Sequence, residues 1–338
     1  MRSAALLMPV FAAVALCVSA PFAQHSSHPL PELESYRIPE PIVAPPETPL
    51  SGQQAELGRR LFFDQRLSGP HSHSCATCHN PSLSWGDGQA RATGVNGATL
   101  PLRSPTLLTV VWQERFGWDG KFKDLESVSL APLANHLNMG LSEDELLRRL
   151  EATPTYVNAF AQAFEDGQIS RNNVAAALAA FQRTIKPGEA PFDRWLAGDE
   201  AALSPEAKRG FTLFTGKAGC AGCHSGWTFS DGSFHDIGSA SGPDIGRGRL
   251  FPTSVKLRYA FKTPTLRDVA RRAPYMHDGS VPTLEAVLDL YDRGGIDRPS
   301  RSPEIRPLSL TAEEKAALLA FLNNLTAEDH LSITSGIR

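Results

Sequence analysis

Long hydrophobic runs are missing from most of this 338-residue sequence. After the N-terminal segment, no apolar stretch is long enough to cross a bilayer as a helix, so we expect no membrane span. An excess of one charge is missing too: the formal net charge is −3, and nothing in the composition indicates a nucleic-acid partner. Cysteine and methionine are scarce, with 5 and 4 residues, so the positions of these few residues are informative.

The one long apolar run lies at the N-terminus, in MRSAALLMPVFAAVALCVSAPFAQ. An early Arg, an apolar core and small residues after it predict a cleaved secretory signal over residues 1–23. Leu16 stands where a small residue would precede a lipidated cysteine, so we expect no lipid anchor on Cys17. We therefore expect a periplasmic protein with an extended, poorly packed, proline-rich leader over residues 24–50.

Four cysteines remain in the mature chain, and they form two closely spaced pairs. The pairs are Cys75 and Cys78 in SCATCHNP, and Cys220 and Cys223 in GCAGCHSG. In an exported protein, four cysteines could form two disulfide bonds or bind one zinc ion. Neither alternative explains why His79 and His224 follow directly. Two cysteines three apart and then a histidine can attach a haem covalently, with the imidazole as proximal iron ligand. We therefore favour two covalently bound c-type haems.

The two halves of the sequence repeat each other. GRRLFF (58–63) corresponds to GFTLFT (210–215), and SPTLLTVVWQERFGWDGKFKDLESV (104–128) corresponds without a gap to TPTLRDVARRAPYMHDGSVPTLEAV (263–287). Each half then ends in an amphipathic segment, at 172–185 and at 311–325. The repeat predicts two cytochrome-c-like haem domains related by internal duplication, over 51–190 and 191–338.

The fold class follows from the same patterns. Alternating apolar residues are rare, and Pro and Gly separate the segments with helical periodicity. Thr311, with Glu314 three residues later, is typical of a helix N-terminus. We expect a mainly α protein with long loops and almost no sheet.

The order of the motifs is a first CxxCH, WDG, a second CxxCH, FKTPTLRDVARRAPYMHDG and a closing LTAEEKAALLAFLNNLT. This order resembles the bacterial dihaem cytochrome c peroxidase family, including its MauG-type branch, over nearly all of the chain from residue 51. The resemblance implies that the first haem reacts with peroxide, that the second relays electrons and that Trp118 lies between them. A core indole is the alternative for Trp118, whose counterpart in the second half is His277.

The resemblance also bears on the free face of the first iron. In the peroxidases, a His sixteen residues after the first CxxCH occupies this face at rest, and this sequence has Val95 there. With no His between His79 and His136, we expect a five-coordinate first iron that needs no reductive activation. The alternative ligands are His71 and His73, which lie in a Pro- and Ser-containing loop and which we expect to face solvent.

Reaction with peroxide needs a group that moves a proton beside the open iron face. The family places a Gln ten residues and a Glu twenty residues after the WDG tryptophan, where this sequence has Val128 and Asn138. In APLANHLNMG, Asn135, His136 and Asn138 are the polar residues left, and His136 is our candidate for proton transfer. A loop histidine with a structural role is the alternative, and the two changed positions weaken the expectation of rapid peroxide turnover.

The segment TLEAVLDLYDRGG (283–295) predicts an amphipathic helix whose apolar stripe ends at Tyr291. In the family's peroxidases, the second iron takes a Met fourteen residues after the His of PY-x-HDG, and this count from His277 ends at Tyr291. Met139 belongs to the first domain and Met276 to a motif that packs against the haem, so neither is a good replacement. MauG-type enzymes have a Tyr here. We therefore expect Tyr291 to bind the second iron, with core packing as the alternative; a phenolate would favour ferric iron.

Together these features predict an exported dihaem oxidoreductase that reacts with hydrogen peroxide. Its electrons would come through the second haem from a small cytochrome c or a cupredoxin. Two alternatives stay open: a MauG-type enzyme that oxidises residues of a partner protein, and a dihaem electron-transfer protein without peroxide chemistry.

Two further positions concern ions and charge. Family members hold calcium between the domains through an Asn before SPT, and this chain has Arg103 there, which disfavours calcium. The segment 247–272 holds eight basic residues and one acidic residue. It either forms a solvated basic face, or neutralises haem propionates, or attracts an acidic donor protein.

Overall fold

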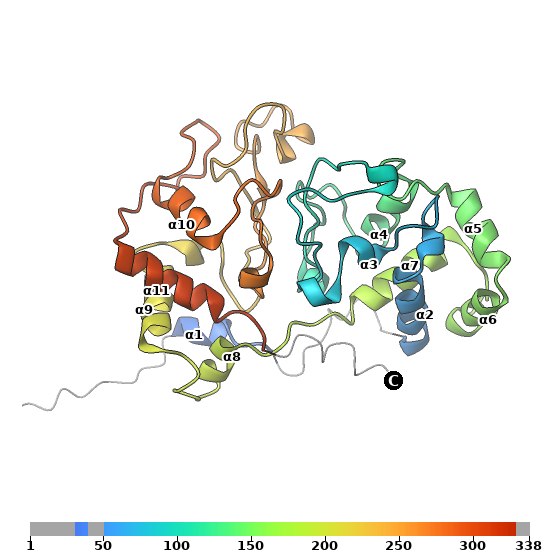
Figure 1. Ribbon diagram of the computed structural model, residues 1–338, viewed down its shortest axis with the longest axis horizontal. Coiled ribbons are helices and arrows are strands. Elements are labelled where there is room, and N and C mark those ends of the chain that lie inside the picture. Colours follow the sequence, from blue (N-terminus) through green and yellow to red (C-terminus); the bar gives the residue numbers. More distant parts are fainter. Residues whose placement is uncertain (1–30, 40–50, 329–338) are drawn as a thin grey trace, which may run out of the picture.

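The computed structural model describes residues 31–39 and 51–328, which form two lobes lying side by side (Figure 1). The predicted signal segment, residues 1–23, lies outside the described residues. The first lobe contains α2 (Gly52–Phe62), α3 (Cys75–Cys78), α4 (Leu125–Ala134), α5 (Glu143–Glu151), α6 (Pro154–Ala163) and α7 (Arg171–Gln182). The second lobe contains α8 (Pro191–Leu196), α9 (Pro205–Thr215), α10 (Leu284–Asp292) and α11 (Ala312–Asn323), with α1 (Pro31–Ser35) packed beside them.

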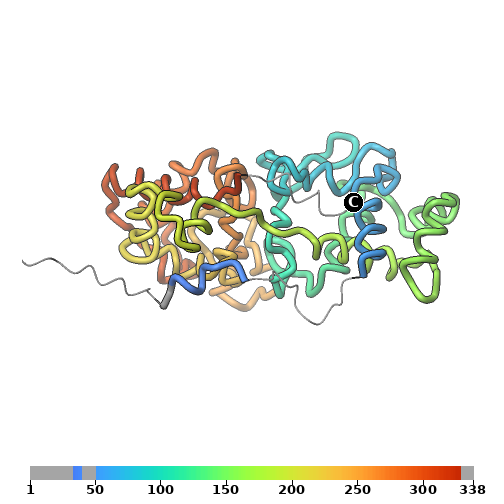
Figure 2. The backbone as a smooth tube through the Cα atoms, turned by 90° about the horizontal axis from the view of Figure 1, so that it is seen from below, coloured from blue at the N-terminus to red at the C-terminus, as the bar shows by residue number. Residues whose placement is uncertain are grey.

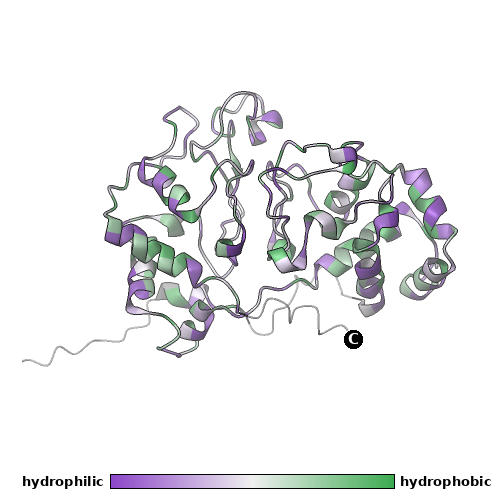
Figure 3. Ribbon diagram, in the orientation of Figure 1, coloured by the Kyte–Doolittle hydropathy of each residue, from purple (hydrophilic) through white to green (hydrophobic). Residues whose placement is uncertain are grey.

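The described chain is mainly helical, as the sequence predicts. Its sheet consists of β1 (Phe234–His235) and β2 (Phe261–Lys262), which pair in antiparallel orientation. Short 3-10 helices punctuate the long loops: η1 (Gln65–Leu67), η2 (Pro81–Leu83), η3 (Val95–Gly97), η4 (Val110–Trp112), η5 (Cys220–Gly222), η6 (Arg247–Arg249) and η7 (Val269–Arg271). The helices carry hydrophobic and hydrophilic residues on the same element, as amphipathic helices do (Figure 3). None of the described helices has the length and apolar character needed to cross a membrane.

In the first lobe, α2 packs closely against α7 because a glycine lies at their contact. A Cβ atom on Gly58 would lie 1.8 Å from the carbonyl oxygen of Ala177, so no larger residue fits without moving a helix. The ring centroids of Phe62 and Phe181 then lie 5.0 Å apart, in the core of the lobe. Burial of aromatic rings of this size stabilises a lobe by about 1.5–3 kcal/mol per side chain.

In the second lobe, α9 and α11 make the same contact. A Cβ atom on Gly210 would lie 1.9 Å from the carbonyl oxygen of Ala317, and the rings of Phe214 and Phe321 lie 5.0 Å apart. The N-terminus of α11 is capped as predicted, with Thr311 and Glu314 exchanging hydrogen bonds with each other's backbone. The two helix pairs therefore present equivalent surfaces to the loops that hold the cysteine motifs.

The expectation of a poorly packed leader is wrong for residues 31–39. This segment lies along the second lobe in both views (Figures 1 and 2), and Tyr36 is 3% exposed within the core of that lobe. The ring of Tyr36 meets Phe192, Phe211 and Phe229 at centroid distances of 6.3, 5.5 and 5.1 Å. The burial of this aromatic ring among three others offsets the cost of ordering a proline-rich segment.

The lobes contact each other through their loops, while the connection between α7 and α8 passes once from one lobe to the other (Figure 2). Ser84 Oγ donates to Asp268 Oδ2 at 3.0 Å, and the N–H of Lys262 donates to the carbonyl oxygen of Trp118 at 2.9 Å. The indole rings of Trp112 and Trp227 pack edge to face at 4.7 Å. This interface brings the loops that follow the two cysteine motifs together.

Candidate haem-binding sites

The first cysteine motif forms a single helical turn, α3. Ser74 caps it, since the Ser74 N–H donates to Thr77 Oγ1 at 3.0 Å and the Thr77 N–H donates back to the Ser74 carbonyl oxygen at 3.1 Å. One turn places Cys75 and Cys78 on the same side of the helix. The turn ends at His79, whose N–H donates to the carbonyl oxygen of Cys75 at 2.9 Å. The fold therefore presents two thiols and an imidazole as one group.

All four cysteines are free and half-buried. The two motifs lie in different lobes, and among the described residues no cluster of possible metal ligands contains cysteines from both motifs. The alternative of one zinc ion held by four thiolates is therefore wrong, and no disulfide joins the described cysteines. Burial raises the pKa of Cys75 and of Cys220 to about 12, so both are protonated thiols at neutral pH.

The two histidines are held in the same way. His79 Nδ1 lies 3.2 Å from the carbonyl oxygen of Trp85, and His224 Nδ1 lies 2.9 Å from that of Phe229. A carbonyl can only accept, so each Nδ1 carries the proton and each Nε2 presents its lone pair. Burial lowers the pKa of both histidines, which keeps them neutral. A neutral imidazole with its other nitrogen fixed by a hydrogen bond is suited to bind a metal.

Trp85 and Phe229 present these carbonyls from strained backbone. Their φ angles are +61° and +51°, in the left-handed region that bulky residues rarely adopt. In both lobes a threonine of the repeat holds the turn: Thr106 Oγ1 donates to the carbonyl oxygen of Ser84, and Thr265 Oγ1 donates to that of Thr228, each at 2.6 Å. The sequence repeat therefore positions both imidazoles through the same hydrogen bonds.

Tyr291 lies in the last turn of α10, beside the second cysteine motif. Burial, together with the neighbouring thiols of Cys220 and Cys223, raises the pKa of Tyr291. Leu284 and Leu288 of the same helix are buried in the core cluster of the lobe, which does not include Tyr291. Among the described residues, no hydrogen bond reaches its phenol oxygen. Tyr291 therefore lies beside the motif and is not a member of the buried core cluster.

Val95 and the segment 135–140 lie together in the first lobe. The N–H of Val95 donates to the carbonyl oxygen of Asn138 at 2.9 Å, and Val95 is 3% exposed. Asn138 is half-buried, whereas His136 is exposed. Of the alternative ligands, His71 is exposed, as expected, and His73 is half-buried with Nδ1 2.8 Å from Ser72 Oγ.

Trp118 lies at the interface between the lobes. Its indole N–H donates to the carbonyl oxygen of Arg103 at 2.8 Å, and the N–H of Arg103 donates to the carbonyl oxygen of His277 at 2.9 Å. His277 stacks on Phe261 at 3.6 Å and lies 3.1 Å from Asp244. Trp118 and His277 occupy corresponding positions in the two halves of the sequence. Both are hydrogen-bonded to the main chain of Arg103. Among the described residues, Met139 is buried in the core of the first lobe, and Met276 has a φ of +72° in the turn before His277.

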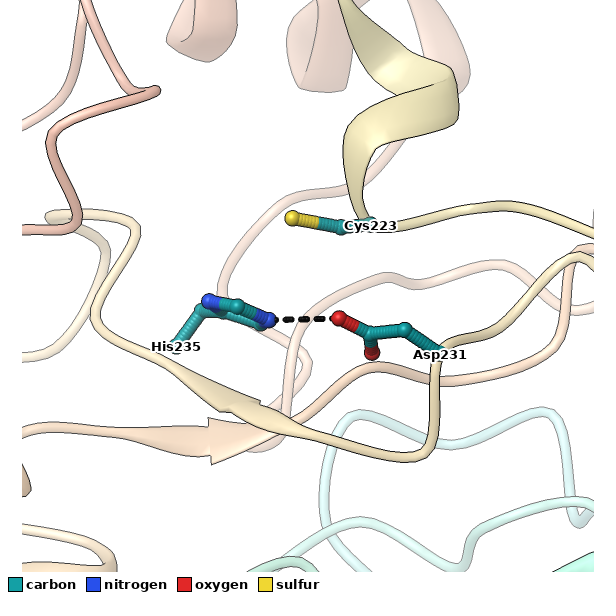
Figure 4. Close-up of side chains that lie close together, drawn as sticks. All are labelled: Cys223, Asp231 and His235. Atoms are coloured by element: carbon teal, nitrogen blue, oxygen red, sulfur yellow. Dashed lines mark hydrogen bonds and ion pairs between the residues drawn. The ribbon is translucent and has the colours of Figure 1, made fainter.

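Asp231 and His235 adjoin the second cysteine motif and were not predicted from the sequence. His235 Nε2 lies 2.8 Å from Asp231 Oδ2, and Cys223 completes a group whose ligand atoms all lie within 4.8 Å (Figure 4). The hydrogen bond to Asp231 is the main cause that raises the pKa of His235 to about 10. The sequence gives little indication of this pair, because SDGSFHD is typical of an ordinary loop. Cys223 belongs to the CxxCH motif, so we interpret Asp231 and His235 as an ion pair beside that motif.

Comparison with known proteins agrees with this geometry. The family model described as di-haem cytochrome c peroxidase matches residues 52–201, and a RoxA-like cytochrome c model matches residues 260–296. The chain is 51% identical over 295 residues to methylamine utilization protein MauG of Methylorubrum extorquens, covering 87% of this chain and 84% of that protein. Methylamine utilization protein MauG of Methylophilus methylotrophus is 43% identical over 299 residues, covering 88% of this chain and 89% of that protein.

A solved structure is also similar. The crystal structure of a MauG-like protein associated with microbial copper homeostasis has a TM-score of 0.79 and 34% identity, covering 87% of this chain and 94% of that chain. The chain therefore belongs to the di-haem cytochrome c peroxidase family and is an oxidoreductase of the haem peroxidase type. Within this family it falls in the MauG-type branch.

Membership of this family implies haem cofactors, and the donor groups fit them. Each lobe offers free thiols and a neutral imidazole whose Nε2 is not engaged by the hydrogen bond at Nδ1. Zinc sites built from four cysteines would instead need thiolates gathered around one point. The residues of both motifs are therefore suited to hold one haem each.

Proposed function

We propose that this protein is a periplasmic MauG-type dihaem oxidoreductase, which reacts with hydrogen peroxide and withdraws electrons from residues of a partner protein. The observation that carries the proposal is Tyr291, which lies beside the second cysteine motif in a position where a peroxidase would have methionine. The 51% identity to a methylamine utilization protein MauG supports it.

Bound haem supplies the redox-active iron at both sites. We propose that Cys75 and Cys78 attach the first haem covalently and that Cys220 and Cys223 attach the second. His79 and His224 would hold the two irons through Nε2, because the Trp85 and Phe229 carbonyls occupy Nδ1. These backbone acceptors also make the imidazoles more strongly donating toward a metal.

The first site is the proposed place of reaction with peroxide. Val95 has no ligand atom, so it would not bind the iron of a haem held by His79, which would stay free to take a small molecule. His136 is the proposed proton-transfer residue, and Asn138 is a proposed catalytic residue that positions peroxide or water. The segment that carries both is fixed by the bond between Val95 and Asn138. An imidazole can gain and lose a proton at neutral pH, whereas an amide only positions a substrate or a water molecule.

The second site is the proposed route for electrons, with Tyr291 as its second protein ligand. Burial raises the pKa of the Tyr291 phenol, and a ferric iron bound there would supply the positive charge that stabilises a phenolate. Trp118 is the proposed connection between the two sites, since it bonds to Arg103 at the lobe interface.

We also propose that the lobes are two domains, over 51–190 and 191–338, that arose by internal duplication. The matching glycine contacts at Gly58 and Gly210 and the matching threonine bonds at Thr106 and Thr265 support a common origin. Calcium is not part of the proposal, because the buried guanidinium of Arg103 puts a positive charge at the position in question.

A peroxidase supplied by a small cytochrome c or a cupredoxin is the second candidate function. The match to the di-haem cytochrome c peroxidase family favours it. One experiment separates the two. The purified protein is first shown by mass spectrometry to carry two haems and is then mixed with hydrogen peroxide. Consumption of peroxide with a reduced small cytochrome identifies a peroxidase. Oxidation of a co-encoded secreted protein, without turnover of the cytochrome, identifies the MauG-type activity.

A further inference from the structure

Two buried arginines from opposite lobes meet at the interface. Arg103 and Arg272 are each 7% exposed. An Nη atom of Arg103 donates to the carbonyl oxygen of Arg272, and an Nη atom of Arg272 donates to the carbonyl oxygen of Thr265. Both guanidinium groups are therefore held in place by main-chain acceptors, which are neutral.

Neither arginine has a carboxylate partner among the described residues. Other buried arginines do: Arg267 pairs with Asp193 at 2.6 Å and Arg298 pairs with Asp236. In contrast, the Nε atoms of Arg103 and Arg272 are buried without any hydrogen-bond partner. A buried cation is costly unless an anion compensates it, and here two cations lie side by side.

The nearest acidic side chains, Asp87 and Asp268, form no ion pair with the two arginines. Asp268 accepts hydrogen bonds from Ser84 Oγ at 3.0 Å and from the N–H of Ala327 at 2.9 Å. Asp87 Oδ1 accepts from the N–H of Gln89 at 3.0 Å, while Asp87 Oδ2 is buried without a hydrogen-bond partner. Burial and the charge of Arg103 lower the pKa of Arg272 to about 10, although Asp268 acts in the opposite direction. The charges of Asp87 and Asp268 thus act on Arg103 and Arg272, but among the described residues no carboxylate is hydrogen-bonded to either guanidinium group.

Each arginine lies next to one cysteine motif. Ser104, which follows Arg103, hydrogen-bonds to Cys78, and the carbonyl of Pro105 contacts His79. On the other side, the charge of Arg272 acts on the pKa of His224. The pair of arginines therefore lies between the two cysteine motifs.

We propose that Arg103 and Arg272 form a carboxylate-binding site at the lobe interface, which takes the propionate groups of the two haems. The inference rests on the proposed dihaem function. Haem carries two carboxylates at one edge of an apolar ring, and a guanidinium binds a carboxylate through parallel hydrogen bonds, for which Nε is one of the donors. Arg103 serves the haem of the first motif, and Arg272 serves the haem of the second.

The test uses the full-length protein with both haems attached, in the variants Arg103→Gln and Arg272→Gln, with exposed Arg306→Gln as the matched control. Haem content is measured first. A wild-type protein without haem would contradict the proposed dihaem function itself, whereas the later measurements test the arginine site. The midpoint potential of each haem and the propionate bands in resonance Raman spectra are then recorded.

We expect Arg103→Gln to lower the potential of the first haem and Arg272→Gln that of the second, since loss of a cation favours the ferric state. The propionate bands shift in both variants and stay at the wild-type position in Arg306→Gln. Unchanged potentials and bands in the two interface variants would overturn the proposal.

If Arg103→Gln accumulates without haem, Arg103→Lys decides. Lysine keeps the charge and loses the planar fork. Near wild-type potentials in Arg103→Lys, with shifted propionate bands, support the carboxylate site. A lysine variant that is as deficient in haem as the glutamine variant assigns Arg103 to lobe packing through the Arg272 carbonyl and overturns the proposal.

Discussion

The main-chain N–H of Val95 donates to the carbonyl oxygen of Asn138 at 2.9 Å, which fixes the segment 135–140 against a residue that has no ligand atom. In a peroxidase, a histidine at the position of Val95 would bind the first iron at rest. In this protein the same position is occupied by the Val95 side chain, which is 3% exposed. The identity of this one residue therefore predicts how the resting enzyme responds to small ligands.

Val95→His should close the first site. The wild-type ferric protein is expected to bind cyanide without prior reduction. If the new imidazole occupies the iron in about nine tenths of the molecules, the apparent affinity for cyanide falls about tenfold. Optical titration and low-temperature EPR check this, with Val95→Leu as the control for steric change. A wild-type protein that binds cyanide only after half-reduction would mean that His71 or His73 is a ligand.

His136→Ala should slow the reaction with peroxide by roughly two to four orders of magnitude, as for loss of a positioned acid–base group. Asn138→Ala is the matched comparison in the same segment, and its effect should be smaller because an amide does not exchange a proton at neutral pH. Stopped-flow spectroscopy measures both rate constants. His136 is exposed. A decrease of only a few-fold in the rate constant would therefore mean that His136 is a surface residue without a role in proton transfer.

The sequence predicts the local features of this protein well, because each is written within a short stretch. The two CxxCH motifs, the cap at Thr311 and the amphipathic helix that contains Tyr291 are examples. Their partners in space are less predictable. Tyr36 packs on Phe192, 156 positions later in the chain, and no local period connects the two residues.

The same limit applies to charges. The segment 247–272 was compatible with a solvated basic face, yet Arg267 and Arg272 are buried. Arg267 pairs with Asp193, whereas Arg272 has no carboxylate partner among the described residues. Whether a basic residue in a loop is solvated, paired or uncompensated depends on contacts between distant segments, which composition does not contain.

Gly58→Ala and Gly210→Ala should each destabilise one lobe. In a helix this change normally stabilises by up to about 1 kcal/mol, but the added methyl would lie 1.8 and 1.9 Å from a carbonyl oxygen. The helices must separate, at a cost of about 3 kcal/mol. Gly52→Ala in α2 is the control, because nothing lies within 4 Å of its Cβ position. Urea unfolding measures the free energies; equal stability of the Gly52 and Gly58 variants would contradict the described packing.

The Asp231–His235 pair should make stability depend on pH. The folded-state pKa of His235 is raised to about 10 from an ordinary value of 6.5. Its contribution is therefore fully present below about pH 6.5 and is lost as the pH rises through about 10. The difference in unfolding free energy between wild type and His235→Gln should shrink over this window. In Asp231→Asn the dependence should become much weaker, because Asp231 is the main cause of the raised pKa of His235. A difference that is constant from pH 6 to 10 would count against the ion pair.

Tyr291→Met should make the second haem behave as an ordinary electron-transfer haem. A thioether stabilises ferrous iron relative to a phenolate, so the potential of the second haem should rise by roughly 100 mV or more, within the range of about 0.8 V that axial ligands set. Spectroelectrochemistry measures the potential of each haem separately. The first haem serves as the internal reference, since Tyr291 lies beside the motif of the second lobe.

Tyr291→Phe distinguishes coordination from packing, because it keeps the ring and removes only the oxygen. Loss of a ligand should change the visible and EPR spectra of the second haem and raise its potential, with haem content unchanged. The neighbouring Leu288→Ala is the matched control: Leu288 is 6% exposed in the core, so its loss should lower stability by about 2–5 kcal/mol without changing the ligands of the iron. If Tyr291→Phe keeps the wild-type spectrum and potential, Tyr291 is a packing residue, and Met276 or a solvent molecule becomes the ligand to test.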